Sequence, residues 1–234
     1  MNGKPSDLRP TFIVRRLSFI VSPVLVHLAL ILAQIFLASL AIVGKLVFPQ
    51  VPPPALVLFR VAGAASLLLL AAMVWGAERI RDRGDLLRLA GLAILGVSAN
   101  QTLFLTGLRH TTAINASILV TTIPVFTVLL SVLLKRETAS GPKVAGILLS
   151  GAGAVYLIGP EHLSLTAGTA LGNMLILTGM VAYSAYLALS KPMLARYRSL
   201  TVTTYVMVLG VPGVLPLGIS GLRKTDLPGV SGVT

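Results

Sequence analysis

The chain has 234 residues, of which 55% are hydrophobic and only 11% are charged. So few charged residues cannot cover the surface of a soluble globule of this length, and the composition therefore indicates a membrane protein. Cysteine is absent, which excludes disulfides and thiolate chemistry. The formal net charge is +12, but the basic residues lie between apolar runs instead of alternating with aromatic residues, so we expect no nucleic-acid partner.

Seven apolar runs follow one another along the chain. A bilayer core of about 30 Å needs about 20 apolar residues per helix, and runs close to this length are separated only by brief connections. The predicted fold is all-α, a polytopic transmembrane helix bundle of about seven helices surrounded by the lipid bilayer. The predicted helices are 24–43, 55–75, 89–108, 114–134, 144–158, 171–190 and 202–219.

The placement of lysine and arginine predicts the orientation of the bundle. If segment 1–23 is cytoplasmic, fourteen of the nineteen basic residues fall on the inner side, as the positive-inside rule favours. They are Lys4, Arg9, Arg15, Arg16, Arg79, Arg81, Arg83, Arg88, Lys135, Arg136, Lys143, Lys191, Arg196 and Arg198. We therefore predict a multi-pass protein of the cell inner (cytoplasmic) membrane with a cytoplasmic N-terminus.

The first predicted helix carries polar and small side chains along one line. At about 100° per residue, His27, Gln34 and Lys45 project within about 40° of each other. A polar face is costly in lipid, so it points either into a substrate cavity or against neighbouring helices. We predict that Gln34 and Lys45 contact the substrate.

The third predicted helix contains the adjacent amides Asn100 and Gln101. Neighbouring residues of a helix point about 100° apart, so both side chains cannot face one cavity fully. We expect one of them to bond a neighbouring helix, and both are candidate substrate contacts.

The fourth predicted helix, which contains TTIPVFTVLLSVLLKRE, has a proline beside polar residues. Pro124 has no amide hydrogen, so the carbonyl of Val120 loses its intrahelical partner and needs a hydroxyl, another helix or water. A kink here either widens a central space or is a tolerated bend in a packed helix. We predict that Asn115 and Thr122 contact the substrate and that Pro124 is structural.

Glu137 lies between this helix and the next. Ser140, Gly141 and Pro142 are typical of a helix start, which places Glu137 near the positive end of helix 144–158 and near Lys143. We interpret it as a clamp of this hairpin; a substrate or proton group and a solvated charge are the alternatives.

Helix 144–158 carries Gly146, Ser150 and Ala154 at four-residue spacing. Small residues at this spacing let helices approach closely. The pattern favours packing within the chain, with a homodimer interface as the alternative.

The sequence has no pattern typical of an enzyme. It lacks a phosphate-binding loop, zinc-ligand spacing and a nucleophile elbow, and all seven acidic residues lie outside the predicted apolar runs. We predict a protein that is not an enzyme, has no cofactor and no metal site, and binds a small-molecule substrate mainly with neutral polar groups.

The sixth predicted helix repeats the pattern of the first. Aligned on each other, Asn173 lies over His27, Ser184 over Ala38 and Lys191 over Lys45. The two copies are an odd number of helices apart, so they are inverted in the membrane, which is typical of transporters. We predict that Tyr183 and Ser184 line the cavity on this helix.

Two stretches of the chain resemble a known family. NQTLFLTGLRHTTAINASILVTTIPVFTVLLSVLLKRE, residues 100–137, and KVAGILLSGAGAVYLIG, residues 143–159, are similar to the EamA-type family of the drug/metabolite transporter superfamily. The resemblance implies two inverted five-helix halves. Residues 24–159 are then the first repeat and residues 160–234 an incomplete second repeat, so we expect a truncated form with missing C-terminal helices. The family positions matched as structural are Arg60, Pro124, Glu137 and Lys191.

These patterns favour an integral membrane transporter, a permease or exporter that moves small metabolites or drugs by alternating access. Two alternatives stay open at this point. The first is a non-transporting membrane protein fragment of a disrupted gene. The second is an organic-anion carrier that uses Lys45, Arg60 and Lys191.

Overall fold

The computed structural model describes residues 23–136, 138, 140–158 and 166–223. The chain divides into two units, Met1–Leu40 and Ala41–Thr234, and each is described by itself. Helix α2 begins in the first unit and ends in the second. The other helices that the structure describes belong to the second unit.

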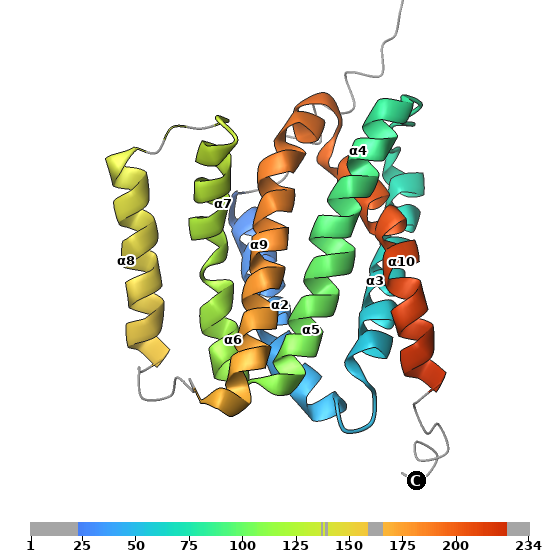
Figure 1. The fold of residues 1–234 in the computed structure, drawn as a ribbon. Helices are drawn as coiled ribbons and strands as arrows, with labels where there is room; N and C mark the ends of the chain where they lie inside the picture. Colours follow the sequence, from blue (N-terminus) through green and yellow to red (C-terminus); the bar gives the residue numbers. More distant parts are fainter. Residues whose placement is uncertain (1–22, 137, 139, 159–165, 224–234) are drawn as a thin grey trace, which may run out of the picture. The chain divides into compact units, whose positions relative to one another are not determined.

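The described part of the chain is helical and contains no strand, so the predicted all-α bundle is confirmed. Five of its helical spans are long and apolar enough to cross a membrane: Pro53–Trp75, Arg83–His110, Ala113–Leu133, Gly168–Arg196 and Ser199–Arg223. Each predicted run coincides with one or more helices (Figure 1). They are α2 (Pro23–Val47), α3 (Pro53–Trp75), α4 (Arg83–Ala93), η1 (Ile94–Ala99), α5 (Asn100–His110), α6 (Ala113–Val120), α7 (Ile123–Leu133), α8 (Gly141–Ile158), α9 (Ala167–Arg196) and α10 (Ser199–Arg223).

Helix α4 begins at Arg83, before the predicted start at Leu89. Asp82 precedes it, and the Asp82 carboxylate accepts a hydrogen bond from the amide of Gly84 at 3.0 Å, which caps the helix. The longer helix includes Asp85, whose side chain is 1% exposed. An acidic residue is therefore buried at this end of the bundle, although none lies in the apolar run that the sequence predicts.

The fourth predicted helix is interrupted next to Pro124, between α6 and α7. The hydroxyl of Thr121 donates to the carbonyl of Ile118 at 2.7 Å, and the hydroxyl of Thr122 donates to the carbonyl of Leu119 at 2.6 Å. Hydroxyl groups thus bond carbonyls at the break, as lipid requires. The two acceptor carbonyls belong to Ile118 and Leu119, the two residues before Val120, whose own carbonyl is the one that Pro124 leaves without an intrahelical donor.

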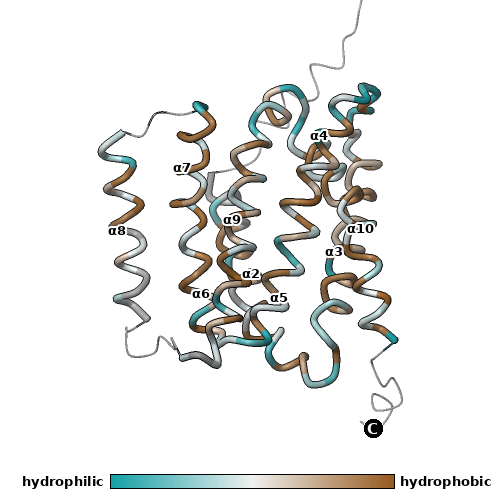
Figure 2. The backbone as a smooth tube through the Cα atoms, viewed as in Figure 1, coloured by the Kyte–Doolittle hydropathy of each residue, from teal (hydrophilic) through white to brown (hydrophobic). Residues whose placement is uncertain are grey.

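The backbones of α5 and α9 come into close contact, and the two helices lie side by side in Figure 1. A Cβ atom added at Gly107 would lie 2.7 Å from the carbonyl oxygen of Gly172, and one added at Gly172 would lie 2.6 Å from the carbonyl carbon of His110. The two backbones can approach this closely only because neither glycine has a side chain. Within the second unit, hydrophilic residues lie mostly near the helix ends (Figure 2).

The glycines of α8 differ from expectation. Among the described residues, no heavy atom lies within 4 Å of a Cβ atom built at Gly146, Gly151 or Gly153. The side chains of Ser150 and Ala154 lie outside the described part of the chain. The predicted close packing within the chain is therefore absent at these glycines, because the described helices leave this face of α8 open.

Candidate functional site

Three polar side chains meet where α6 begins. The hydroxyl of Thr111 donates to the Oδ1 atom of Asn173 at 2.6 Å, and Nδ2 of Asn115 lies 3.1 Å from the Thr111 hydroxyl and 3.2 Å from Asn173 Oδ1. Asn115 is 1% exposed. Thr111 and Asn115 share a partner, Asn173, which is on α9. This group therefore joins α6 to α9.

Replacing Asn115 by leucine should lower the free energy of unfolding by about 1 to 2 kcal/mol, because the buried Thr111 and the half-buried Asn173 lose a hydrogen-bond partner. Thermal unfolding of the purified protein in a neutral detergent measures this. Ser117→Ala on the same helix is the control, since Ser117 is exposed and bonds only its own helix. An equal effect of both changes would contradict the assignment.

Two more predicted substrate contacts also bind α9 to its neighbours. Nδ2 of Asn100 donates to the carbonyl of Gly179 at 3.0 Å, and the hydroxyl of Ser184 donates to the carbonyl of Ile123 at 3.1 Å. Both side chains are buried. For Asn100, Asn115 and Ser184 the structure thus favours helix–helix bonding, an alternative that the sequence leaves open for Asn100.

Arg60 and Gln101 form a polar pair between two spanning helices. Nη1 of Arg60 on α3 donates to Oε1 of Gln101 on α5 at 2.8 Å. Both residues are half-buried. A guanidinium inside a spanning helix is costly and in membrane proteins marks a functional position, and Gln101 supplies its acceptor. Of the two adjacent amides, Gln101 is therefore the one that contacts a charged group.

Tyr183 and Tyr186 stack near the π-helical segment η1. Their ring centroids are 5.6 Å apart, and a Cβ atom added at Gly96 in η1 would lie 2.5 Å from the Tyr186 ring. Turns of π-helix inside α-helices are frequent at functional sites. Sequence reasoning includes Tyr183 but misses Tyr186, although a glycine in a long apolar run is a signal of close packing.

The remaining predicted residues do not converge. Nζ of Lys45 donates to the carbonyl of Arg109 at 3.4 Å, at the end of α5 that packs on Gly172. Lys191 is exposed near the other end of α9, about 28 Å from Gly172 at roughly 1.5 Å per residue. The structure therefore separates two of the three cations of the organic-anion alternative.

The structure does not test the predictions for Gln34 and Glu137. Gln34 lies on α2 within the unit that ends at Leu40, and the two units are described separately. Glu137, the predicted hairpin clamp, lies outside the described residues.

A buried carboxylate connects α4 to the end of α9. Asp85 lies 2.8 Å from Arg196 and accepts a hydrogen bond of 2.7 Å from the hydroxyl of Tyr197, while Arg88 is 3.5 Å away. The hydrogen bond to Asp85, followed by burial and the negative charge of Asp85, raises the pKa of Tyr197. A second contact lies just after the end of α9, where Arg198 donates to the carbonyl of Gly76, the residue that follows α3, at 2.8 Å.

Replacing Asp85 by alanine should lower the free energy of unfolding by about 1 to 2 kcal/mol. Breaking an ion pair in which both partners are buried costs more than this. Here Arg196 is 58% exposed, so water solvates its guanidinium after the carboxylate is removed and reduces the cost. In the wild type, the bond to Tyr197 persists until the pH rises through its raised pKa, above the usual tyrosine value of about 10. Chemical unfolding in detergent measures the loss. Arg88→Gln, at a 67% exposed side chain, should change stability by less than about 0.5 kcal/mol.

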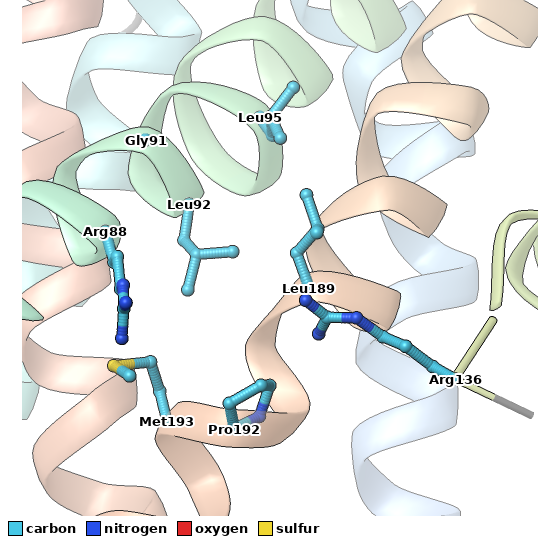
Figure 3. Close-up of a pocket in the computed structure, with 8 residues that line it drawn as sticks. All are labelled: Arg88, Gly91, Leu92, Leu95, Arg136, Leu189, Pro192 and Met193. Carbon is cyan, nitrogen blue, oxygen red and sulfur yellow. The ribbon is translucent and has the colours of Figure 1, made fainter. Parts of the chain in front are cut away.

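A pocket of about 440 Å³ opens at the same end of the bundle. In Figure 3, Arg88 and Arg136 lie on opposite sides of it, with apolar side chains between them. Nη1 of Arg136 donates to the carbonyl of Ala188 at 3.2 Å. The lining residues are Arg88, Gly91, Leu92, Leu95, Arg136, Leu189, Pro192 and Met193.

This arrangement of apolar spans around polar pairs agrees with the comparisons to known proteins. The sequence model of the EamA-like transporter family matches residues 24–159, which is more than half of the chain. The chain belongs to the EamA-like transporter family. It is thereby a multi-pass membrane protein of a family of transporters, and its described spans contact the lipid bilayer.

Relatives of this EamA-like chain carry transporter names. An uncharacterized transporter of Archaeoglobus fulgidus is 32% identical over 82% of this chain and 66% of its own length. A probable terminal-alkyne amino-acid exporter of Streptantibioticus cattleyicolor is 35% identical over 68% of this chain and 52% of its own. The uncharacterized transporter YetK of Bacillus subtilis is 26% identical over 86% and 62%.

The EamA-like chain spans about half to two thirds of the length of the curated relatives it matches. No solved structure gives a significant match.

Proposed function

We propose that this chain transports small molecules across the cytoplasmic membrane by alternating access, with its N-terminus in the cytoplasm. Residues 24–159 act as one five-helix repeat, and residues 160–234 contribute helices of an inverted second repeat. The observation that carries the proposal is the Arg60–Gln101 pair, a guanidinium and an amide held 2.8 Å apart between two spanning helices.

The packing of α9 and α10 supports a division into repeats. Helix α9 packs against α5 and α7, and α10 packs against α3. Helices of residues 160–234 are thus inserted among those of residues 24–159, and transporters built from inverted repeats bind their substrates at such an interface. Arg60 and Gln101 lie on α3 and α5, the helices that contact α10 and α9.

The pair also suggests a class of substrate. Arginine binds carboxylates through charge-assisted hydrogen bonds, and one relative is named as a probable exporter of a terminal-alkyne amino acid. We infer that the chain carries small metabolites with a carboxylate, such as amino acids, which bind at Arg60 and Gln101. The half-buried Thr122 and Tyr183, together with Lys45, are the further expected substrate contacts.

Efflux from proteoliposomes tests the function. The 234-residue protein is reconstituted, and the vesicles are loaded with a panel of labelled compounds: an amino acid with a terminal alkyne, neutral amino acids, a dicarboxylate and inorganic phosphate. We expect faster loss of one or more amino acids than from protein-free vesicles. Selective loss of phosphate or dicarboxylate would instead favour the organic-anion carrier, and retention of the whole panel would favour the non-transporting alternative.

A further inference from the structure

The pocket between α4, η1, α9 and the end of α7 has a composition that transport through the bundle does not explain. Two arginines face each other across a lining that is otherwise apolar (Figure 3). We propose that this pocket binds an anionic amphiphile: a phosphate or carboxylate head group between Arg88 and Arg136, and an apolar chain against Leu92, Leu95 and Leu189.

Arg136 is held in the pocket by the bend of α9. Pro192 lies inside this helix and has no amide hydrogen, so the carbonyl of Ala188, four residues earlier, lacks its intrahelical donor. Nη1 of Arg136 supplies this donor at 3.2 Å. A guanidinium has five N–H groups. The one described hydrogen bond therefore fixes the side chain and leaves further donors for an anion.

Counted over the side chains that the structure describes, the positive charge at the pocket exceeds the negative charge around it. Arg88 is 3.5 Å from Asp85, but this carboxylate is also 2.8 Å from Arg196 and accepts the Tyr197 hydroxyl. Among the described residues, Asp85 is thus shared by two arginines, and Arg136 forms no ion pair. Three arginines and one carboxylate leave two positive charges, which a bound anion compensates.

The size and position of the pocket fit a head group with part of a chain. Its volume of about 440 Å³ lies within the range of roughly 300–1,000 Å³ that is typical of ligand pockets. It opens where α4 begins and α9 ends, the side of the membrane that the basic residues predict to be cytoplasmic. Basic pockets between spanning helices on this side bind anionic head groups.

Such a ligand has two possible sources, an anionic lipid of the surrounding membrane or a water-soluble amphiphilic anion. The experiment uses the 234-residue protein in a neutral detergent and two probes: phosphatidylglycerol, with phosphatidylcholine for comparison, and hexyl phosphate. Bound phosphatidylglycerol is counted by native mass spectrometry, and hexyl phosphate binding by calorimetry. Binding of the first probe alone assigns the site to lipid, and binding of the second alone assigns it to a soluble anion.

Two variants test whether the pocket is the site. Gly91→Leu adds a bulky side chain to the pocket lining. No atom outside the chain neighbours and the backbone of its own helix lies within 4 Å of a Cβ atom at Gly91, so the added side chain causes no clash with another helix, and leucine raises helix propensity. We expect it to narrow the pocket. Arg88→Gln removes one charge. We expect each variant to weaken binding at least tenfold.

Matched controls exist for both variants. Gly63→Leu adds the same side chain on α3, where there is also open space, and Arg83→Gln removes an exposed charge on α4 outside the pocket. Both controls should bind like the wild type.

The proposal is overturned if neither probe binds, if phosphatidylcholine binds as well as phosphatidylglycerol, or if Gly91→Leu and Arg88→Gln bind like their controls. These results do not depend on transport. A protein that exports nothing still binds the probe if the pocket is an anion site, and a transporter without the pocket function still passes the efflux test.

Discussion

Replacing Gly172 by valine should destabilise the bundle more than any other single change considered for this chain. A Cβ atom at this position would lie 2.6 Å from the carbonyl carbon of His110, 2.8 Å from its oxygen and 2.7 Å from the carbonyl oxygen of Gly107. All three are backbone atoms, so no side-chain rotation relieves the overlap. The helices α5 and α9 must move apart.

Moving α9 away from α5 would also stretch hydrogen bonds that α9 forms with its neighbours. The hydrogen bonds from Asn100 to the carbonyl of Gly179 and from Thr111 to Asn173 both span the contact between α9 and the helices beside it. Overpacking costs about 1 to 3 kcal/mol where a core can adjust, and more where it cannot. We expect a loss of about 3 kcal/mol or more, measured as a lower unfolding temperature in detergent or as loss of the monodisperse protein.

The control for this prediction lies on the same helix. A Cβ atom at Gly168 meets only the Thr166 hydroxyl, at 3.9 Å, so Gly168→Val should leave the unfolding temperature nearly unchanged. Gly172→Ala should fall between the two. If Gly172→Val and Gly168→Val unfold alike, α5 and α9 do not cross as closely as described.

The helices were largely predictable because the bilayer sets their length. An apolar run of about 20 residues has few alternatives in lipid, so all seven predicted runs coincide with helices. The start of α4 was missed for a different reason. Residues 83–88 include three charged side chains and a glycine, which interrupt the apolar run. What extends the helix is the Asp82 cap and the burial of Asp85 against Arg196, a contact with a residue far along the chain.

The candidate site was predictable only in part. Helical periodicity assigns Asn100 and Asn115 to a face but does not say whether a cavity or another helix lies opposite. In both cases the partner is α9, at Gly179 and Asn173, which no local pattern reveals. Gln101 is the amide that reaches Arg60, and only the packing of α3 against α5 distinguishes it from its neighbour.

At Pro124 and at Pro192 a helix contains a proline, which has no amide hydrogen and leaves a backbone carbonyl without its intrahelical donor. Beside Pro124, the hydroxyls of Thr121 and Thr122 bond carbonyls of the preceding turn. At Pro192, the freed carbonyl of Ala188 accepts a hydrogen bond from Arg136, which follows the end of α7. The first arrangement is local, so a Thr-Thr-x-Pro sequence predicts it. The second needs a long side chain from a distant part of the chain, and it places Arg136 in the lining of the pocket that we propose as an anion site.

If carboxylate substrates bind at Arg60 as proposed, replacing Arg60 by glutamine should reduce the preference for a carboxylate. Charge-assisted hydrogen bonds contribute about 1.5 to 3 kcal/mol, so KM for an amino-acid substrate should rise about tenfold or more, while KM for the corresponding primary amide should hardly change. Arg60→Lys keeps the charge but loses the planar fork, and it should give an intermediate value.

The comparison of acid and amide distinguishes binding from support of the fold. If Arg60 only positions α3 against α5 through Gln101, its replacement lowers the amount or stability of the protein and affects both substrates equally. Arg223→Gln, at an exposed side chain at the end of α10, controls for the loss of one positive charge. Unchanged discrimination in Arg60→Gln would remove the guanidinium from substrate binding, because a group that contacts the carboxylate cannot lose its charge without affecting the acid more than the amide.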